Sequence, residues 1–316
     1  MRIAVHSNAG TKFLEDLIEH WKSRGHTVEF EPGANPALDA EADLVFIDFL
    51  DNNFYRLFNG EMGSDAPNWK SEPKKKLFVR AVDIDVWMGR HRDPRIWEYL
   101  DGMFVINDFF KKKIIEESNN IPLAQEKVHM VRMGVNLDKF TLKKESDNNH
   151  RIAMVADTMW YAKAPFEAVR LLEMLRSRTG VDYTLHIRGQ WDPPEWHNVA
   201  WNHLLKSLDI EDKVILYNRQ DDMNEWYEDK DYILCTSYKE AFSFALAEGM
   251  AKGLKPVSAD FFAARETWPE WAIYTNWQNA LGMLLENTHP EKYRKFIEEN
   301  YSSEKMVREY DAILGT

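Results

Sequence analysis

The sequence is almost devoid of cysteine. Its 316 residues contain a single one, Cys235, which lies inside an apolar run. Without a second cysteine no disulfide can form within the chain, and this composition is typical of proteins that work in a reducing compartment. We therefore expect a cytoplasmic protein.

Long apolar runs are also missing. No window approaches the roughly 18 consecutive apolar residues that a membrane-spanning helix needs. Met1 leads into a short strand-like run instead of a charged start followed by a long apolar stretch. We expect neither a secretion signal nor a transmembrane segment, and a peripheral position at a membrane is the alternative to a freely soluble protein.

Positive charge is scarce. The chain has 40 Lys and Arg against 52 Asp and Glu, a formal net charge of -12. Proteins whose main task is to neutralise a nucleic-acid backbone rely on an excess of Lys and Arg. The composition therefore argues against nucleic acid as the main partner, although a local basic patch is compatible with it.

The length favours two domains, because single hydrophobic cores stop growing at about 250 residues. A polar stretch over 142–150 loses all apolar periodicity and predicts a linker. We expect an N-terminal domain over 1–145, a second domain over 150–288 and a purely helical tail over 289–316.

Strand-like and helical segments alternate in both halves, which predicts an α/β fold with two doubly wound, mostly parallel sheets. The strands expected in the first half are 2–6, 27–30, 43–47, 77–81 and 102–106. Those expected in the second half are 152–156, 183–188, 214–217, 232–236 and 256–259.

The most informative segment is 240–253, which follows an apolar strand and opens a helix rich in small residues. Ligands of open α/β sheets bind at the carboxyl ends of the strands. Small residues allow close approach to the backbone, and free N–H groups in a first helical turn favour an anion such as a diphosphate. The carboxylates of Glu240 and Glu248 are suited to hydrogen-bond sugar hydroxyls.

This pair of glutamates, separated by seven residues and leading into 249–257, resembles the donor-site signature of retaining glycosyltransferases of family four. Segment 214–237 resembles the nucleotide-binding half of that family, and 133–140 resembles its signature before the interdomain linker. The similarity covers residues 128–270 well and the N-terminal domain loosely. It implies the GT-B architecture, in which two Rossmann-like domains face a central cleft and the last helices pack back across the junction.

The resemblance implies a role for several residues. Glu248 would bind the ribose hydroxyls, and Glu240 would contact the transferred sugar. Lys163 would take the place of the phosphate-binding lysine of the family, and its charge would stabilise the departing diphosphate, so that no metal is needed. The backbone of four residues would face the sugar and diphosphate: Phe242, Ser243, Phe244 and Ala245.

One departure from the family concerns an arginine after the first strand of the second domain, where this chain has Asp157. A second phosphate-binding cation would then come from Arg188 or Arg219. Trp160 and Trp191 follow the first two strands of that domain, and we expect them as candidates for stacking on a sugar.

A second departure concerns Val82, which stands where relatives carry a histidine near the reaction centre. Asp83, Asp85 and His91 are the candidates to replace it. The two aspartates, one residue apart, also fit the metal motif of the other large glycosyltransferase fold. We favour a site without metal because a two-Rossmann pattern surrounds the motif.

The residues and the resemblance together predict an enzyme that moves a hexose or pentose from a nucleoside diphosphate sugar, UDP- or GDP-linked, to an acceptor hydroxyl. Retention of configuration is what the resemblance implies. No cofactor is expected. The acceptor would be a glycan, a lipid-linked molecule or a small molecule on the N-terminal domain, where Gly10 and Thr11 form a tight turn. The alternatives are an inactive sugar-nucleotide or glycan-binding protein of the same fold and a transferase acting on modified DNA bases.

Overall fold

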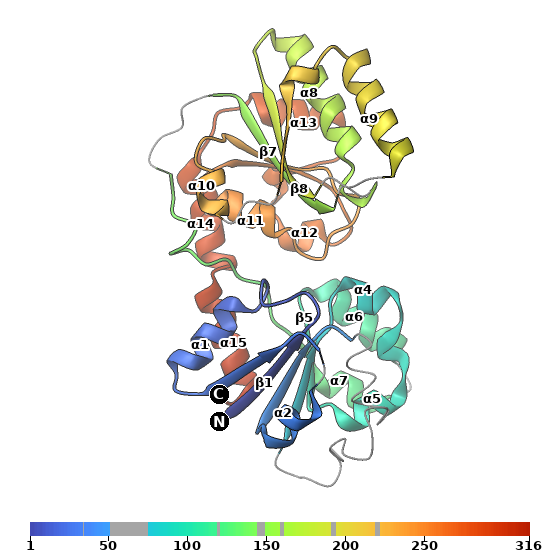
Figure 1. Ribbon diagram of the computed structural model, residues 1–316, viewed down its shortest axis with the longest axis vertical. Coiled ribbons are helices and arrows are strands. Elements are labelled where there is room, and N and C mark those ends of the chain that lie inside the picture. Colours follow the sequence, from blue (N-terminus) through green and yellow to red (C-terminus); the bar gives the residue numbers. More distant parts are fainter. Residues whose placement is uncertain are drawn as a thin grey trace. The chain divides into compact units, whose positions relative to one another are not determined.

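The computed structural model describes residues 1–33, 35–50, 75–118, 121–143, 149–158, 161–190, 194–218 and 222–316. The chain divides into two compact units (Figure 1). Unit 1 comprises Met1–Gly134 and Ser303–Thr316, and unit 2 comprises Val135–Ser302.

Unit 1 is built on a parallel sheet of six strands in the order β2-β1-β3-β4-β5-β6. The order reverses at β1, which has β2 on one side and β3 on the other. The strands are β1 Arg2–Ser7, β2 Thr27–Glu31, β3 Leu44–Asp48, β4 Lys76–Arg80, β5 Gly102–Val105 and β6 Val128–Met130.

Helices flank this sheet and bury an apolar stripe against it. In the first helix the stripe is Leu17, Ile18 and Trp21, at helical spacing. The helices of unit 1 are α1 Glu15–Ser23, α2 Pro36–Glu41, α4 Asp83–Trp87, the 3₁₀ turn Arg90–Arg92, α5 Pro94–Tyr99, α6 Asp108–Glu117, α7 Pro122–Lys127 and α15 Ser303–Leu314.

The helix α15 belongs to the core of unit 1 although it is the last element of the chain. Its buried residues pack in one cluster with Phe46 of β3 and Phe104 of β5; they are Met306, Val307, Tyr310 and Leu314. It lies beside α1 (Figure 1), and Asp311 accepts a hydrogen bond of 2.6 Å from His20. The sheet of unit 1 is therefore covered by helices from both ends of the sequence.

Unit 2 has a second parallel sheet of six strands, in the order β12-β11-β10-β7-β8-β9. The order reverses between β7 and β10, which is the kind of topological switch point where open α/β sheets bind ligands. The strands are β7 Arg151–Thr158, β8 Thr184–Gln190, β9 Val214–Tyr217, β10 Tyr232–Cys235, β11 Lys255–Ala259 and β12 Ile273–Tyr274.

The helices of unit 2 cover this sheet around a core that includes Leu172, Leu185, Trp201 and Val257. They are the 3₁₀ turn Tyr161–Lys163, α8 Pro165–Thr179, α9 Glu195–Ser207, the 3₁₀ turn Glu211–Lys213, α10 Met223–Trp226, α11 Phe244–Ala251, α12 Ala264–Thr267, the 3₁₀ turn Glu270–Ala272, α13 Trp277–Leu285 and α14 Pro290–Asn300. Among the described residues, no helix combines the length and the apolar character needed to cross a bilayer.

The predicted class of two doubly wound α/β halves is confirmed by these two sheets. Contacts divide the chain at 134/135, whereas the sequence suggested a boundary in 142–150. Residues 135–143 pack on unit 2 because Val135 donates its N–H to Tyr301 and Lys143 donates to Lys252. The tail expected to be purely helical consists of α14 in unit 2 and α15 in unit 1.

Candidate functional site

The loops that follow β7 and β10 meet at one edge of the unit 2 sheet. The two strands are parallel neighbours, so their carboxyl ends lie at the same edge. The loop after β7 carries Lys163 at the end of a 3₁₀ turn, and the loop after β10 carries Glu240 before α11 begins at Phe244. The sequence therefore delivers a cation and a carboxylate to the switch point of the sheet.

Lys163 and Glu240 form an ion pair at this edge. The Lys163 Nζ lies 2.5 Å from Glu240 Oε1, and the Ser237 hydroxyl donates to the same oxygen at 2.7 Å. The Glu240 side chain is 12% exposed and that of Lys163 is 30% exposed. Two donors on one partly buried carboxylate fix its orientation, and the Lys163 side chain remains partly exposed to solvent.

Glu248 stands one turn into α11 and is half-buried. The phenol of Tyr227, which is fully buried, donates to Glu248 Oε2 at 3.2 Å. The following residue, Gly249, packs directly on β10, because a Cβ at that position would lie 2.8 Å from the Cβ of Ile233. Close packing of helix on strand and one tyrosine hydroxyl together hold the Glu248 carboxylate.

The start of α11 lies between Glu240 and Glu248 in the sequence. Ser243 occupies the N-cap position, and its side chain makes no capping hydrogen bond there. The Phe242 ring packs in an aromatic cluster with Phe244, Trp268 and Tyr301, at centroid distances of 5.0, 5.3 and 5.4 Å. Because the Phe242 ring is occupied in this way, only its backbone is available to face a ligand.

The remaining donor-side candidates lie farther along the sheet. Arg188 is in β8, 7% exposed, and pairs in register with Val155 and Tyr217. Arg219, Trp160 and Trp191 fall outside the described residues.

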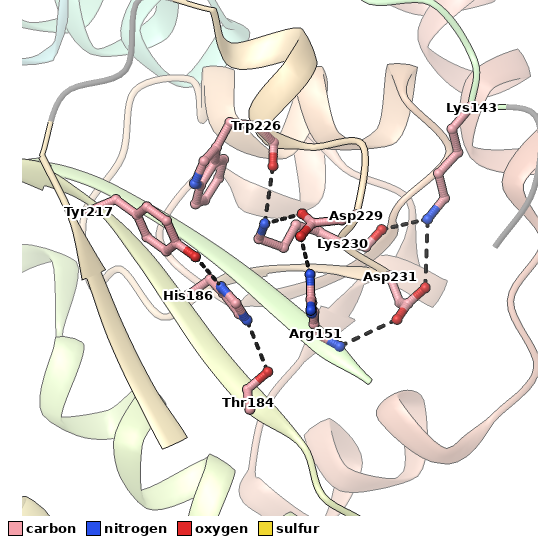
Figure 2. Close-up of polar contacts among 9 residues, drawn as sticks. All are labelled: Lys143, Arg151, Thr184, His186, Tyr217, Trp226, Asp229, Lys230 and Asp231. Carbon is pink, nitrogen blue, oxygen red and sulfur yellow. Dashed lines mark hydrogen bonds and ion pairs between the residues drawn. The ribbon is translucent and has the colours of Figure 1, made fainter. Parts of the chain in front are cut away.

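The opposite edge of the unit 2 sheet carries a partly buried polar cluster, at the amino ends of β7, β8 and β10 (Figure 2). In it Lys143 Nζ donates to the carbonyl of Lys230 at 2.5 Å and lies 3.6 Å from Asp231. These bonds attach residues 135–143 to unit 2. The cluster comprises Lys143, Arg151, Thr184, His186, Tyr217, Trp226, Asp229, Lys230 and Asp231.

In unit 1, Asp85 is completely buried at the start of α4. It accepts the N–H of Val82 at 3.0 Å and a hydrogen bond of 3.0 Å from Arg90. Burial raises the pKa of Asp85 to about 6, although hydrogen bonds from the backbone of Val82 and Leu50 act to lower it. Asp83, the other member of the expected pair, is half-buried. Both oxygens of Asp85 thus serve the cap of α4 and Arg90, an arrangement that does not fit the two-aspartate metal alternative.

His91 is also buried within unit 1, in the 3₁₀ turn after α4. Its Nε2 lies 2.8 Å from a carboxylate oxygen of Glu117 in α6. Burial lowers the pKa of His91, and the Glu117 carboxylate opposes this shift. Burial acts to raise the pKa of Glu117, but hydrogen bonds from Arg92 and Lys113 outweigh it and lower this pKa to about 2. His91 is therefore held by α6 and has no exposed surface.

Gly10 and Thr11 form the predicted turn after β1. The N–H of Gly10 donates to the carbonyl of Ser7 at 3.2 Å, and Gly10 adopts a φ of +73° that favours glycine. The carbonyl of Thr11 accepts the N–H of Leu14 at 2.7 Å and so leads into α1.

The sequence analysis missed a buried row at the carboxyl edge of the unit 1 sheet. Ser7, Asp48 and Arg80 end three adjacent strands and stand in register. The Ser7 hydroxyl donates to Asp48 at 3.1 Å, and Arg80 Nε donates to the same carboxylate at 2.7 Å. A polar residue at the end of each of three apolar strands was the signal for it.

The match that shows the family lies mostly in unit 2. The model of the family described as Glycosyl transferases group 1 matches residues 138–312, more than half of the chain. The chain belongs to this family. No curated protein sequence matches the sequence of this chain.

Solved structures agree on the fold, and the predicted GT-B architecture is confirmed. The chain is similar to a glycosyltransferase from Rickettsia africae, with a TM-score of 0.72 at 15% identity over 99% of this chain and 98% of that one. It is similar to HepE from Anabaena in complex with UDP and glucose, with a TM-score of 0.72 at 12% identity over 100% and 99%. It is also similar to sucrose-phosphate synthase from Thermosynechococcus elongatus, with a TM-score of 0.73 at 11% identity over 99% and 98%.

Proposed function

We propose that this group 1 glycosyltransferase moves a hexose or pentose from a nucleoside diphosphate sugar to an acceptor hydroxyl. The observation that carries the proposal is the juxtaposition of Lys163 and Glu240 at the switch point of the unit 2 sheet. A UDP-linked donor is our first choice, because similar folds include a protein in complex with UDP-glucose. We propose a cytoplasmic location, from the lone buried cysteine.

Each residue at this edge has a proposed task. Glu248 binds the ribose hydroxyls, and Glu240 binds hydroxyls of the transferred sugar. Lys163 stabilises the negative charge that develops on the departing diphosphate. The backbone N–H groups from Phe242 to Ala245 face the sugar and diphosphate, since the first turn of a helix favours an anion.

A lysine in this position supplies the charge that a divalent ion supplies in other transferases. We therefore propose a reaction that needs no metal and that retains the configuration at the anomeric carbon. Turnover that EDTA leaves unchanged, and a product whose anomeric proton coupling matches that of the donor, are the expected results. A requirement for added Mg²⁺ or an inverted product would contradict these two points.

On unit 1, we propose that the turn containing Gly10 and Thr11 contacts the acceptor, which is a glycan, a lipid-linked molecule or a small molecule. Asp83 is the half-buried carboxylate we propose in place of the histidine that relatives carry at Val82. Asp85 and His91 are occupied by Arg90 and Glu117, so we give them no catalytic task.

The test begins with a thermal-shift screen of nucleoside diphosphate sugars. A donor at about one hundred times its dissociation constant adds roughly 2.7 kcal/mol to the free energy of unfolding. Glu248→Ala should then weaken nucleotide binding roughly 10- to 100-fold, since hydrogen bonds to a charged group contribute about 1.5–3 kcal/mol.

Lys163→Ala should reduce kcat by roughly 100-fold or more and leave nucleotide binding within a few fold of the unsubstituted protein. Lys239→Ala, four residues after the end of β10 and next to Glu240, is the matched control and should retain turnover. Binding of a donor without turnover on any acceptor would support the inactive binding protein instead. Activity on DNA alone, lost at raised salt, would support the transferase for modified bases.

A further inference from the structure

The two loops at the proposed donor site are joined by a hydroxyl group that is not part of the ion pair. Thr236 directly follows β10 and is 1% exposed. Its Oγ1 lies 2.8 Å from the carbonyl oxygen of Lys163 and 3.1 Å from that of Ala164, and it donates to this pair of acceptors. One buried hydroxyl from the β10 loop therefore holds two successive carbonyls of the β7 loop.

The backbone at this point has an uncommon conformation. Ala164 has φ of 47° and ψ of 53°, in the left-handed region that residues with a Cβ seldom adopt. Such a conformation is unfavourable for a residue with a Cβ and persists only where its surroundings fix it. The next residue is Pro165, which restricts Ala164 further and begins α8. The strain lies directly after the lysine proposed to bind the diphosphate.

A second bond holds the other side of Lys163. The N–H of Tyr238 donates to the carbonyl of Ala162 at 2.9 Å, again from the β10 loop to the β7 loop. The carbonyls of Ala162, Lys163 and Ala164 are thus all bonded to residues that follow β10. A lysine side chain has many accessible rotamers, so a fixed backbone limits the positions that its ammonium can reach.

We propose that Thr236 is a positioning residue: its hydroxyl holds the left-handed turn at Ala164 and so directs Lys163 to Glu240 and to the leaving diphosphate. The inference rests on the proposed function of Lys163. It assigns to Thr236 no contact with substrate. Its effect is expected on kcat, where charge develops on the leaving group, and not on the KM for the donor.

The experiment compares Thr236→Val, which keeps the shape and removes the hydroxyl, with Thr236→Ser, which keeps the hydroxyl. With the donor that gives the largest thermal shift, Thr236→Val should lower kcat about tenfold and change the donor KM less than twofold. Thr236→Ser should remain within twofold of the unsubstituted protein. In a Lys163→Ala background, Thr236→Val should have no further effect on kcat.

The matched control is Thr184→Val in the same unit. Its hydroxyl bonds to His186 at 2.9 Å at the amino end of β8, away from the proposed site. It should lower stability to a similar extent and leave kcat unchanged, which separates positioning from a general loss of stability. If Thr236→Val does not fold, Thr236→Cys, which keeps the size with a weaker donor, replaces it with the same expectations.

A crystal structure of Thr236→Val tests the inference without any donor. The Lys163 Nζ should leave Glu240, and Ala164 should leave the left-handed region. An unchanged ion pair, or an unchanged kcat in Thr236→Val where Lys163→Ala is inactive, would overturn the inference. Full turnover of Lys163→Ala would instead overturn the proposed role of Lys163, and the inference with it.

Discussion

His186 is held in its neutral form by its surroundings. Figure 2 shows its ring between the Tyr217 hydroxyl and the Thr184 hydroxyl, each 2.9 Å away. Burial, aided by the positive charge of Lys230, lowers the pKa of His186 to about 4. Since an unfolded histidine titrates near 6.5, between pH 6.5 and 4 the unfolded chain binds a proton that the folded chain does not.

Unit 2 should therefore lose stability on acidification, with His186 contributing a loss of about 2 kcal/mol between pH 7 and 5. In His186→Gln this part of the loss should vanish, so that urea unfolding curves of the variant move less with pH. His289→Gln, at an exposed histidine, serves as the control. Equal pH slopes for His186→Gln and the unsubstituted protein would show that His186 is not held neutral.

Asp85 should have the opposite effect in unit 1. Because burial raises the pKa of Asp85 to about 6, the folded chain holds a proton between pH 4 and 6 that the unfolded chain has released. Its contribution to stability is thus present at low pH and is lost as pH rises through 6, by up to about 3 kcal/mol. An asparagine at this position cannot titrate. The free energy of unfolding of Asp85→Asn minus that of the unsubstituted protein should therefore increase from pH 4 to pH 7. Parallel pH curves from denaturant unfolding would refute this.

At the residue scale, the sequence pointed to Lys163, Glu240 and Glu248 because their positions in the chain resemble those of the family signature. It did not point to Ser237, Thr236 or Tyr227, which hold those residues. A hydroxyl becomes a hydrogen-bond partner only after strands distant in the sequence are side by side, and serine, threonine and tyrosine are common enough that their positions alone carry little information. The roles of the three charged residues stay predictions.

Two glycines in helices of unit 2 differ in the space that a side chain would have at their positions. Gly249 in α11 has Ile233 of β10 within 2.8 Å of the place a Cβ would take, whereas Gly282 in α13 has nothing within 4 Å. Gly249→Ala should push α11 from β10 and lower the free energy of unfolding by about 1–3 kcal/mol. Because Glu248 precedes it, donor binding should weaken as well.

Gly282→Ala is the matched control and should raise the unfolding free energy by up to about 1 kcal/mol, since alanine has less freedom to lose in a helix. Chemical denaturation measures both. A neutral Gly249→Ala would mean that α11 can shift without loss.

Elements with strong patterns were predicted within a residue or two, such as β1, β9 and β10. The short strands β6 and β12 were missed, because three and two residues are too few to show a period. The helix α13 was missed too, and the helical tail was predicted without the point at which one helix ends and the next begins. The break between α14 and α15 at Tyr301 has no glycine or proline to mark it.

At the scale of the molecule, α15 couples the end of the chain to the core of unit 1. Tyr310 is fully buried, with its ring 4.7 Å from Phe104 and 5.8 Å from Phe46. Tyr310→Ala should lower the stability of unit 1 by about 3–5 kcal/mol, because it removes a large aromatic side chain from a packed core. Hydrogen exchange should then speed up in β3 and β5, some two hundred residues away in sequence.

The control for this prediction is Leu175→Ala in α8, which is buried in the core of unit 2. It should accelerate exchange in β7 and β8 and spare β3 and β5. Faster exchange in unit 2 alone for Tyr310→Ala would contradict the assignment of α15 to unit 1. The family resemblance implied last helices that pack back across the junction, but the sequence of α15 alone could not show it, since the apolar face of a helix does not indicate which of two sheets it covers.

The membership of α15 in unit 1 has a consequence for biosynthesis. Residues 1–134 leave the ribosome before residues 303–316, so their core lacks Met306, Val307, Tyr310 and Leu314 until that later segment has been synthesised. Residues 135–302 are continuous and can close their own core earlier. Unit 1 therefore begins to be synthesised before unit 2 but is completed after it, and its unfilled apolar surface is open to chaperones during that interval.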